Sequence, residues 1–122
     1  MKLIGILIGS ENPERLAEYY GRIFGTAGWV DGAYTGWQFG SAYVTVGPHD
    51  QVIGQNAHPG RVIWNLESSD VPADFARFRD AGAIVVREPY EMGSEGYQGW
   101  IATFADPDDN YFQLMSPMSA PS

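Results

Sequence analysis

Residues 100–117 read Trp-Ile-Ala-Thr-Phe-Ala-Asp-Pro-Asp-Asp-Asn-Tyr-Phe-Gln-Leu-Met-Ser-Pro. Two apolar runs in this stretch, residues 101–104 and 111–115, are rich in the aromatic and aliphatic side chains that favour strands. Between them, residues 106–110 read Asp-Pro-Asp-Asp-Asn. The chain turns there because Pro fixes its own φ and Asp and Asn side chains hydrogen-bond nearby backbone groups. The stretch predicts an antiparallel β-hairpin.

The first half of the chain predicts one strand, one helix and a group of short strands. Residues 3–8 are an apolar run that is typical of a buried strand. The helix that follows has Ser10 or Asn12 as its N-cap and Pro13 in its first turn, and it ends at Gly25. Glycine-rich breaks then separate three predicted strands, at residues 29–30, 34–39 and 42–46.

The same order of elements recurs after a polar linker, residues 48–60, which holds both histidines. The second half predicts a strand at residues 61–67, a helix with Ser69 or Asp70 as its N-cap, a strand at 84–87, a loop at 88–99 and the hairpin. The sequence therefore predicts one α+β domain of two βαβββ modules, residues 1–47 and 61–116, with a frayed tail at residues 117–122.

Composition limits the classes of function. The 122-residue chain has a net charge of −8. This argues against a nucleic-acid partner, because only seven Lys and Arg side chains are present to neutralise phosphates. The acids are spread without a run, which indicates a soluble surface, with attraction of a cationic ligand as the alternative. The chain has no Cys, which excludes disulfides and thiolate sites. With no apolar run of about eighteen residues we expect no membrane partner, and the absence of Cys fits a reducing cytosol, so we expect a cytoplasmic protein.

The turn at residues 106–110, followed by a strand that ends in Gln-Leu, resembles the last hairpin of the vicinal oxygen chelate superfamily. That superfamily holds glyoxalase I, the extradiol dioxygenases and the bleomycin-resistance proteins. The doubled βαβββ order extends the resemblance to nearly the whole chain. The resemblance implies that the two half-sheets curl into an open, mixed sheet whose concave face holds a ligand, and that two chains pair as a homodimer.

Metal-dependent members of this superfamily bind their ion through His and Glu on the first and last strands of each module. Carried onto this sequence, those positions fall at Gly5, within residues 42–46, at Ile63 (with Asn65 on the same face) and at Gln113. None of the four offers an ordinary ligand for a divalent metal. His49 and His58 lie in the linker, where exposed loop histidines are the favoured interpretation. We therefore expect no metal cofactor.

A cavity without a metal can still bind a small molecule. Strand alternation directs residues near the lost ligand positions toward it. For each Trp, burial in the core is the alternative, because aromatic rings bury much apolar area. A buried Arg61 that faces Gln113 would orient an anionic substrate. The predicted ligand-binding residues are Trp37, Arg61, Ile63, Asn65, Tyr97, Trp100, Tyr111, Gln113 and Met115.

Three functions follow from the sequence, and the first is the favoured one. It is sequestration of a small aromatic or cationic molecule in a metal-free cavity, as the resemblance to bleomycin-resistance proteins implies. The second is a glyoxalase-like lyase or isomerase, or a dioxygenase, working through Arg61, Tyr111 or a substrate carboxylate. The third is an interaction module without a ligand. The sequence shows no nucleophile–base set, because no Ser has a His nearby.

Overall fold

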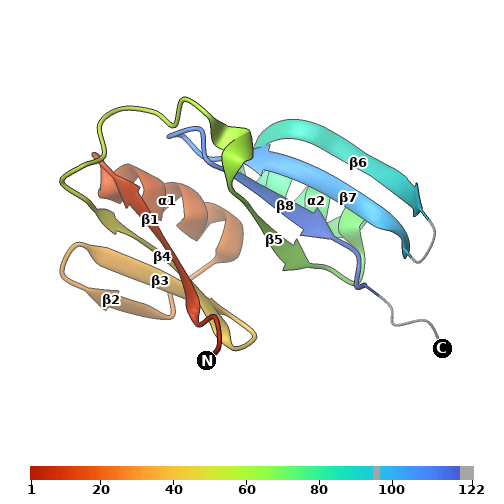
Figure 1. The fold of residues 1–122 in the computed structure, drawn as a ribbon, viewed down its shortest axis with the longest axis horizontal. Coiled ribbons are helices and arrows are strands. Elements are labelled where there is room, and N and C mark those ends of the chain that lie inside the picture. Colours follow the sequence, from red (N-terminus) through yellow and green to blue (C-terminus); the bar gives the residue numbers. More distant parts are fainter. Residues whose placement is uncertain (95–96, 119–122) are drawn as a thin grey trace.

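The computed structural model describes the backbone of residues 1–94 and 97–118. It does not describe the side chains of residues 94–98. Two four-stranded sheets have the same topology, β1-β4-β3-β2 (the first sheet) and β5-β8-β7-β6 (the second sheet). In each sheet, the first strand pairs in parallel with the last strand of its module. This confirms an α+β fold of two βαβββ modules, and the sheets form an open layer (Figure 1). The elements are β1 (Gly5–Ser10), α1 (Pro13–Phe24), β2 (Trp29–Asp31), β3 (Tyr34–Phe39), β4 (Ala42–Pro48), a 3₁₀ turn (Pro59–Arg61), β5 (Ile63–Glu67), α2 (Val71–Asp80), β6 (Ile84–Ser94), β7 (Tyr97–Ala105) and β8 (Tyr111–Met115).

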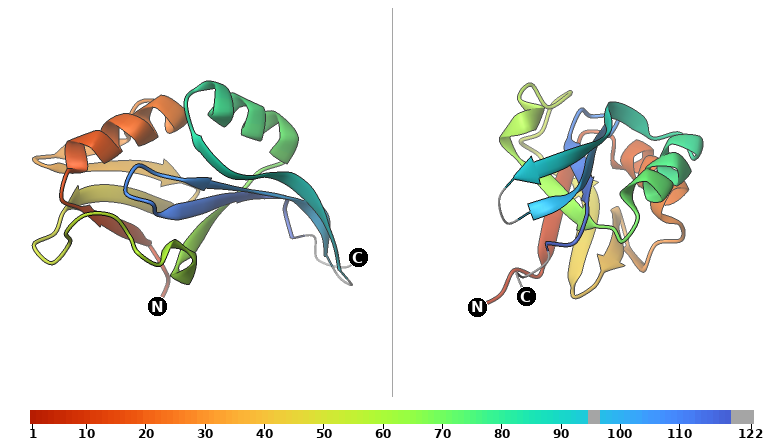
Figure 2. Two further views of the ribbon diagram at one scale, coloured as in Figure 1. Left: turned by 90° about the horizontal axis from the view of Figure 1, so that it is seen from above. Right: turned by 90° about the vertical axis from the view of Figure 1, so that its right-hand side faces the viewer.

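Both helices cover the same side of the two sheets (Figure 2). We call the uncovered side the open face. The edge strands β1 and β5 line the two sides of a groove where the sheets meet, and we call this groove the seam (Figure 1). The seam and the open face are therefore the places where this fold leaves strands accessible.

The two helices begin where the sequence predicts. Asn12 caps α1, and its side chain accepts a hydrogen bond from the backbone of Arg15 at 3.3 Å. Asp70 caps α2 in the same way, through the backbone of Ala73 at 3.1 Å. Both helices have Pro in the first turn, where a missing N–H costs no helical hydrogen bond.

One hydrophobic core joins both modules, and Tyr20 of α1 lies at its centre. The Tyr20 ring is fully buried and contacts rings from both sheets, including Trp37 of β3 at 6.1 Å and Phe112 of β8 at 5.8 Å between centroids. Phe75 and Phe78 of α2 close the core over the second sheet. Since edge-to-face and stacked aromatic pairs add to simple area burial, this cluster fixes how the two sheets meet.

A buried polar junction adds to that core. The Tyr20 hydroxyl donates to Asp106 at 2.7 Å, and the Ser10 hydroxyl donates to Asp108 at 2.5 Å. Arg15 forms an ion pair with the same Asp108. The turn that the sequence predicts at residues 106–110 is thus the place where the first helix binds the second module.

Part of the linker lies against the same turn. The backbone N–H of Asn56 donates to Asp108 at 2.8 Å, its side chain donates to Asn110 at 3.1 Å, and Gln55 donates to the carbonyl of Pro107 at 3.0 Å. We call residues 50–56 the strap, because they run from β4 to this turn beside the seam.

Two predicted segments differ from the structure. The first strand begins at Gly5, and Leu3 is exposed. The predicted loop at residues 88–99 is mostly strand, because β6 and β7 extend as a long hairpin on either side of residues 95–96, which lie outside the description. Register shifts beside Arg87 let the edge strand accommodate Pro89. Of the predicted frayed tail, residues 119–122 lie outside the described residues.

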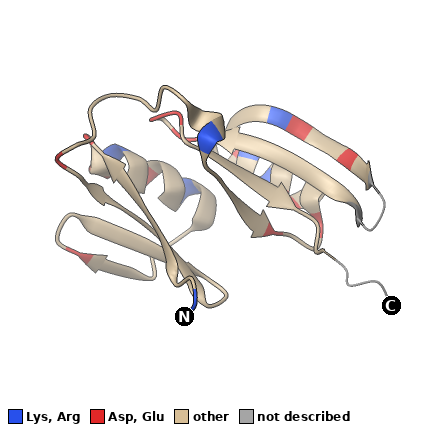
Figure 3. Ribbon diagram, viewed as in Figure 1, with Lys and Arg blue, Asp and Glu red and all other residues tan. Residues whose placement is uncertain are grey.

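Charged residues lie on the helices, in the turns and on strands β2, β5 and β6, as Figure 3 shows. Strands β1, β3 and β4 carry none, and Asp31 of β2 is the one charged residue within the strands of the first sheet. No helix in the described part of the chain is long and apolar enough to cross a membrane.

Candidate functional site

The open face of the first sheet exposes aromatic side chains. Alternation along the strands sends Val44, Val46 and Trp37 toward the helices, and sends their neighbours to the open face. Trp29, Tyr34 and Tyr43 remain 37%, 38% and 38% exposed there. Large exposed aromatic side chains gathered on one face are unusual for a surface that has no binding partner.

These side chains surround a hollow of about 730 Å³, which we call the aromatic hollow. Its wall is mainly apolar, and its polar groups are neutral. Asp31 pairs with Tyr34 across β2 and β3, so its carboxylate projects on the same face. The side chains that line the hollow include Leu7, Trp29, Tyr34, Gln38, Tyr43 and Thr45.

Two glycines give the aromatic rings their places. Gly36 pairs with Trp29, and a Cβ at Gly36 would lie 2.3 Å from Nε1 of that indole. A Cβ at Gly47 would lie 2.2 Å from Cδ1 of Tyr34. Both rings therefore lie over backbone that has no side chain of its own, which sets the depth of the hollow.

The aromatic hollow continues into the seam. A second hollow of about 810 Å³ shares Gly5, Ile6 and Tyr43 with the first. It reaches Ile63 and Asn65 on β5, two of the predicted ligand-binding residues. An aromatic wall and a polar end thus belong to one continuous depression.

Five of the predicted residues share the open face of the second sheet. Phe112 and Leu114 are buried under α2, so β8 turns the intervening residues to the open side. The strand register places β5 residues beside them. The amide of Gln113 donates to Thr103 at 2.9 Å, which leaves its oxygen as an acceptor. The five residues are Ile63, Asn65, Tyr111, Gln113 and Met115.

The other four predicted residues lie elsewhere. Trp37 is 4% exposed in the core, where its Nε1 donates to the carbonyl of Gly25 at 3.0 Å. Trp100 packs against the core on the helix side of β7. Arg61 is exposed in the 3₁₀ turn before β5. The expectation that it is a buried strand residue facing Gln113 is therefore wrong. Tyr97 begins β7, and its side chain lies outside the described residues.

The aromatic residues that line the hollow, Trp29, Tyr34 and Tyr43, were missed by the sequence-based prediction. A signal for them exists in the sequence, because Gly36 and Gly47 occupy open-face positions on adjacent strands. Glycine inside a strand often marks a place where another group approaches the backbone closely. Here those groups are Trp29 and Tyr34.

The residues present do not fit a divalent metal. The four positions that correspond to metal ligands in the superfamily are filled by Gly5, Tyr43 or Thr45, Ile63 or Asn65, and Gln113. Their oxygens are neutral, and none of the four strands carries a His. The single carboxylate on these strands, Glu67, ends β5. Among the described residues no three His, Cys, Asp or Glu side chains are grouped closely enough to hold an ion.

The buried titratable groups lie at the polar junction and away from the aromatic hollow. Burial raises the pKa of Asp106 above its ordinary value of 3.8, although hydrogen bonds from Asn110 and Tyr20 act in the opposite direction. Burial also raises the pKa of Tyr19 to about 12 and raises the pKa of Tyr20 well above its ordinary value, with the charge of Asp106 adding to the effect in both. Both phenols therefore stay protonated and serve as hydrogen-bond donors.

The comparisons with known proteins agree with this architecture. A family profile described as a glyoxalase-like domain matches residues 5–115. No curated protein sequence matches the chain. A solved glyoxalase-related enzyme from Fulvimarina pelagi has 17% sequence identity and a TM-score of 0.73, over 96% of this chain and 88% of that one.

Two further solved structures share the fold at similar identity. A glyoxalase/bleomycin resistance protein/dioxygenase family enzyme from Burkholderia phytofirmans PsJN has 17% identity and a TM-score of 0.71, over 95% of this chain and 98% of that one. A glyoxalase/bleomycin resistance protein from Albidiferax ferrireducens T118 has 14% identity and a TM-score of 0.74, over 94% and 98% of the two chains. At this level of identity the likeness concerns the fold, and the site has to be argued from the residues of this chain.

Proposed function

Since the chain belongs to the glyoxalase-like domain family, within the vicinal oxygen chelate superfamily, we propose that it binds a small aromatic or cationic molecule on its open face without a metal ion. The aromatic hollow is the binding site in this proposal. The function is sequestration, of the kind that the name bleomycin resistance protein implies for a structural neighbour.

The observation that carries the proposal is the seating of Trp29 and Tyr34 over glycine. Two aromatic rings held in fixed positions beside a hollow of about 730 Å³ offer flat surfaces to a planar ligand. Aromatic faces also attract cations, by about 0.5–2 kcal/mol for each contact. The carboxylate of Asp31 on the same face and the net charge of −8 favour a cation further.

Polar groups at the far end of the depression would orient the ligand. Asn65 lies on the wall of the seam hollow, and Gln113 is its neighbour across β5 and β8. An amide can donate or accept, so this pair suits a ligand with a carbonyl or amine group. In the proposal, the aromatic wall provides most of the binding energy and the amides select orientation.

We propose in addition that a second copy of the chain covers the open face. Leu7 is 55% exposed and lies beside Tyr43 on this face, together with the other aromatic side chains. Pairing of two such faces would remove this apolar surface from water and enclose the ligand.

Calorimetric titration with a planar aromatic cation, ethidium, tests the proposal. We expect saturable binding that a chelator leaves unchanged, and weaker binding of the neutral analogue phenanthridine. Replacing Trp29 with Ala should weaken ethidium binding about tenfold, because a ring face is lost. Replacing Val30 with Ala is the matched control, because that side chain is on the opposite face of the same strand. Equal affinity of wild type and W29A would refute the site, and binding that requires added metal would refute the metal-free mechanism.

A further inference from the structure

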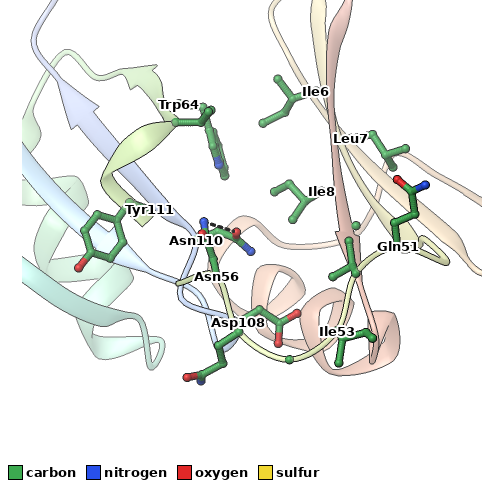
Figure 4. A pocket seen from close by; sticks show the side chains of 15 residues that line it. Ile6, Leu7, Ile8, Gln51, Ile53, Asn56, Trp64, Asp108, Asn110 and Tyr111 are labelled. Carbon is green, nitrogen blue, oxygen red and sulfur yellow. Dashed lines mark hydrogen bonds between the residues drawn. The ribbon is translucent and has the colours of Figure 1, made fainter. Parts of the chain in front are cut away.

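A third cavity lies at the strap end of the seam. It shares Ile6 and Leu7 with the aromatic hollow, and Ile6, Val62 and Trp64 with the seam hollow. It has a volume of about 630 Å³, and we call it the strap cavity. Figure 4 shows Ile6 and Ile8 of β1 along one wall and Trp64 of β5 on the other. Ile53 and Asn56 of the strap complete it. The volume is that of a typical small-molecule site.

The indole N–H of Trp64 is the unusual feature of this cavity. Its Nε1 is buried and is the one buried side-chain nitrogen or oxygen without a hydrogen-bond partner among the residues that the structure describes. A buried donor left unpaired destabilises the fold, whereas pairing it removes that cost. The indole cannot turn away, because its ring is stacked on Phe112 at 4.9 Å between centroids and packs against Phe24 at 6.1 Å.

The neighbouring amides do not supply an acceptor. The side-chain nitrogen of Asn110 donates to both carboxylate oxygens of Asp106, which fixes the orientation of that amide. The Asn110 oxygen accepts from the side chain of Asn56, and the Asn56 oxygen accepts from the backbone N–H of His58. In Figure 4 the indole points toward Asn56 and Asn110. These two amides already hydrogen-bond to each other, and Asn110 also donates to Asp106.

The cavity has no free charge to offer. Among the described residues, Asp108 is the only charged one that lines it, and its two carboxylate oxygens are engaged by Ser10 and by Arg15. A charged ligand would lose its hydration without finding a counter-ion there. The rest of the lining is apolar or carries neutral groups, namely amides and the phenol of Tyr111.

We propose that the strap cavity is a second binding site, distinct from the aromatic hollow, for a small neutral molecule with an apolar body and one carbonyl-type acceptor. The apolar body lies against Ile6 and Ile8, and the acceptor receives the hydrogen bond of Trp64 Nε1. Because Nε1 is buried, entry requires the Asn56 end of the strap to move slightly, and the hydrogen bonds that hold Asn56 to Asp108 and Asn110 are few enough to permit it.

The indole N–H resonances of ¹⁵N-Trp-labelled protein provide the test, since the chain has four Trp residues. The signal that Trp64→Phe removes belongs to Trp64, and Trp100→Phe is the control variant with a ring outside the cavity. Benzamide is the probe with an acceptor, and toluene is the probe without one. We expect benzamide to move the Trp64 proton downfield in a saturable way.

Affinities in the variants separate a direct contact from a structural role. Trp64→Phe should weaken benzamide binding about tenfold, as loss of one buried hydrogen bond implies, and leave toluene binding nearly unchanged. Trp100→Phe should change neither affinity. The inference is overturned if benzamide leaves the Trp64 signal in place, if it moves only the Trp29 signal of the aromatic hollow, or if Trp64→Phe weakens both probes equally.

Discussion

A Cβ on residue 36 would lie 2.3 Å from Nε1 of Trp29, so Gly36 is what allows the indole to lie over the first sheet. The contact is with the indole ring and not with backbone, and Trp29 is partly exposed. A larger residue would therefore displace the ring without disrupting the strand. The position of the ring and the stability of the fold can be tested separately.

Replacing Gly36 with Ala should weaken ethidium binding about three- to tenfold, because Trp29 leaves its position beside the hollow. Calorimetry measures the affinity, and a thermal melt measures stability. Replacing Gly60 with Ala is the control, since an added Cβ meets no atom within 4 Å there. If G36A binds ethidium as wild type does, Trp29 does not form the wall of the site.

The pH dependence of unfolding should report on Asp106. Its pKa is raised in the folded state, so the folded protein binds more protons than the unfolded chain between 3.8 and the folded pKa. The stability contributed by this group is complete below pH 3.8 and is lost as the pH rises through that window. Urea unfolding at a series of pH values should show this loss in wild type.

The Asp106→Asn variant should lack that slope and be less stable by about 3 kcal/mol, because its side chain offers one fewer acceptor to the donors around it. Asp109→Asn, in the same turn, should keep the wild-type slope. Asn also tolerates the φ of 64° found at that residue. An unchanged slope in D106N would show that another group titrates in this window.

Replacing Tyr20 with Phe should lower the free energy of unfolding by about 1–3 kcal/mol, because the buried carboxyl of Asp106 loses a donor at 2.7 Å. Chemical denaturation with a constant m-value measures the change. Tyr43→Phe, which removes a hydroxyl from the open face, should be neutral in the absence of ligand. Equal stabilities for Y20F and wild type would mean that water replaces the hydroxyl at the junction.

The proposed pairing of open faces predicts a dimer in solution at micromolar concentration. Leu7→Asp should convert it to a monomer in sedimentation experiments, because a charge is placed in the apolar contact. Ile84→Asp adds the same charge to an exposed position on the outer strand of the second sheet and should leave the dimer intact. A monomeric wild-type protein would contradict the pairing.

Divalent metals should leave the melting temperature unchanged. The donor set on β1, β4, β5 and β8 contains no His and one carboxylate, Glu67, so it offers little affinity to Ni, Zn, Mn or Fe. Elemental analysis of protein purified without an affinity tag should find no stoichiometric metal. A stoichiometric ion with a raised melting temperature would favour the enzymatic alternative.

The order of the elements could be predicted from the sequence because its signals are local, whereas the arrangement of the two sheets was implied by the resemblance to the superfamily. Helix caps at Asn12 and Asp70, the alternation in β5 and β8, and the turn at residues 106–110 all follow from neighbouring residues. The strand residues 88–94 and 97–99 were missed because Pro89 and three glycines in this stretch of the sequence are typical of a loop, whereas the structure accommodates Pro89 in a bulged edge strand.

The site could be predicted only in part, for a related reason. Alternation identifies which residues share a face, and it grouped Ile63, Asn65 and Gln113 correctly. It does not identify which face the helices cover. That is why Trp37 was expected in the cavity and is found in the core, while Trp29 and Tyr34 are found at the hollow. The orphan N–H of Trp64 depends on contacts between both modules and the strap, which no local pattern encodes.

The polar junction has a consequence for how the chain folds. The central ring of the core, Tyr20, belongs to the first module, and the carboxyl that it binds belongs to the second. A separated first half would expose the Tyr20 ring. A separated second half would leave Asp106 without the hydrogen bond from the Tyr20 hydroxyl. The two halves repeat the same order of elements, yet they form one cooperative unit, so hydrogen exchange should find both sheets opening in a single event.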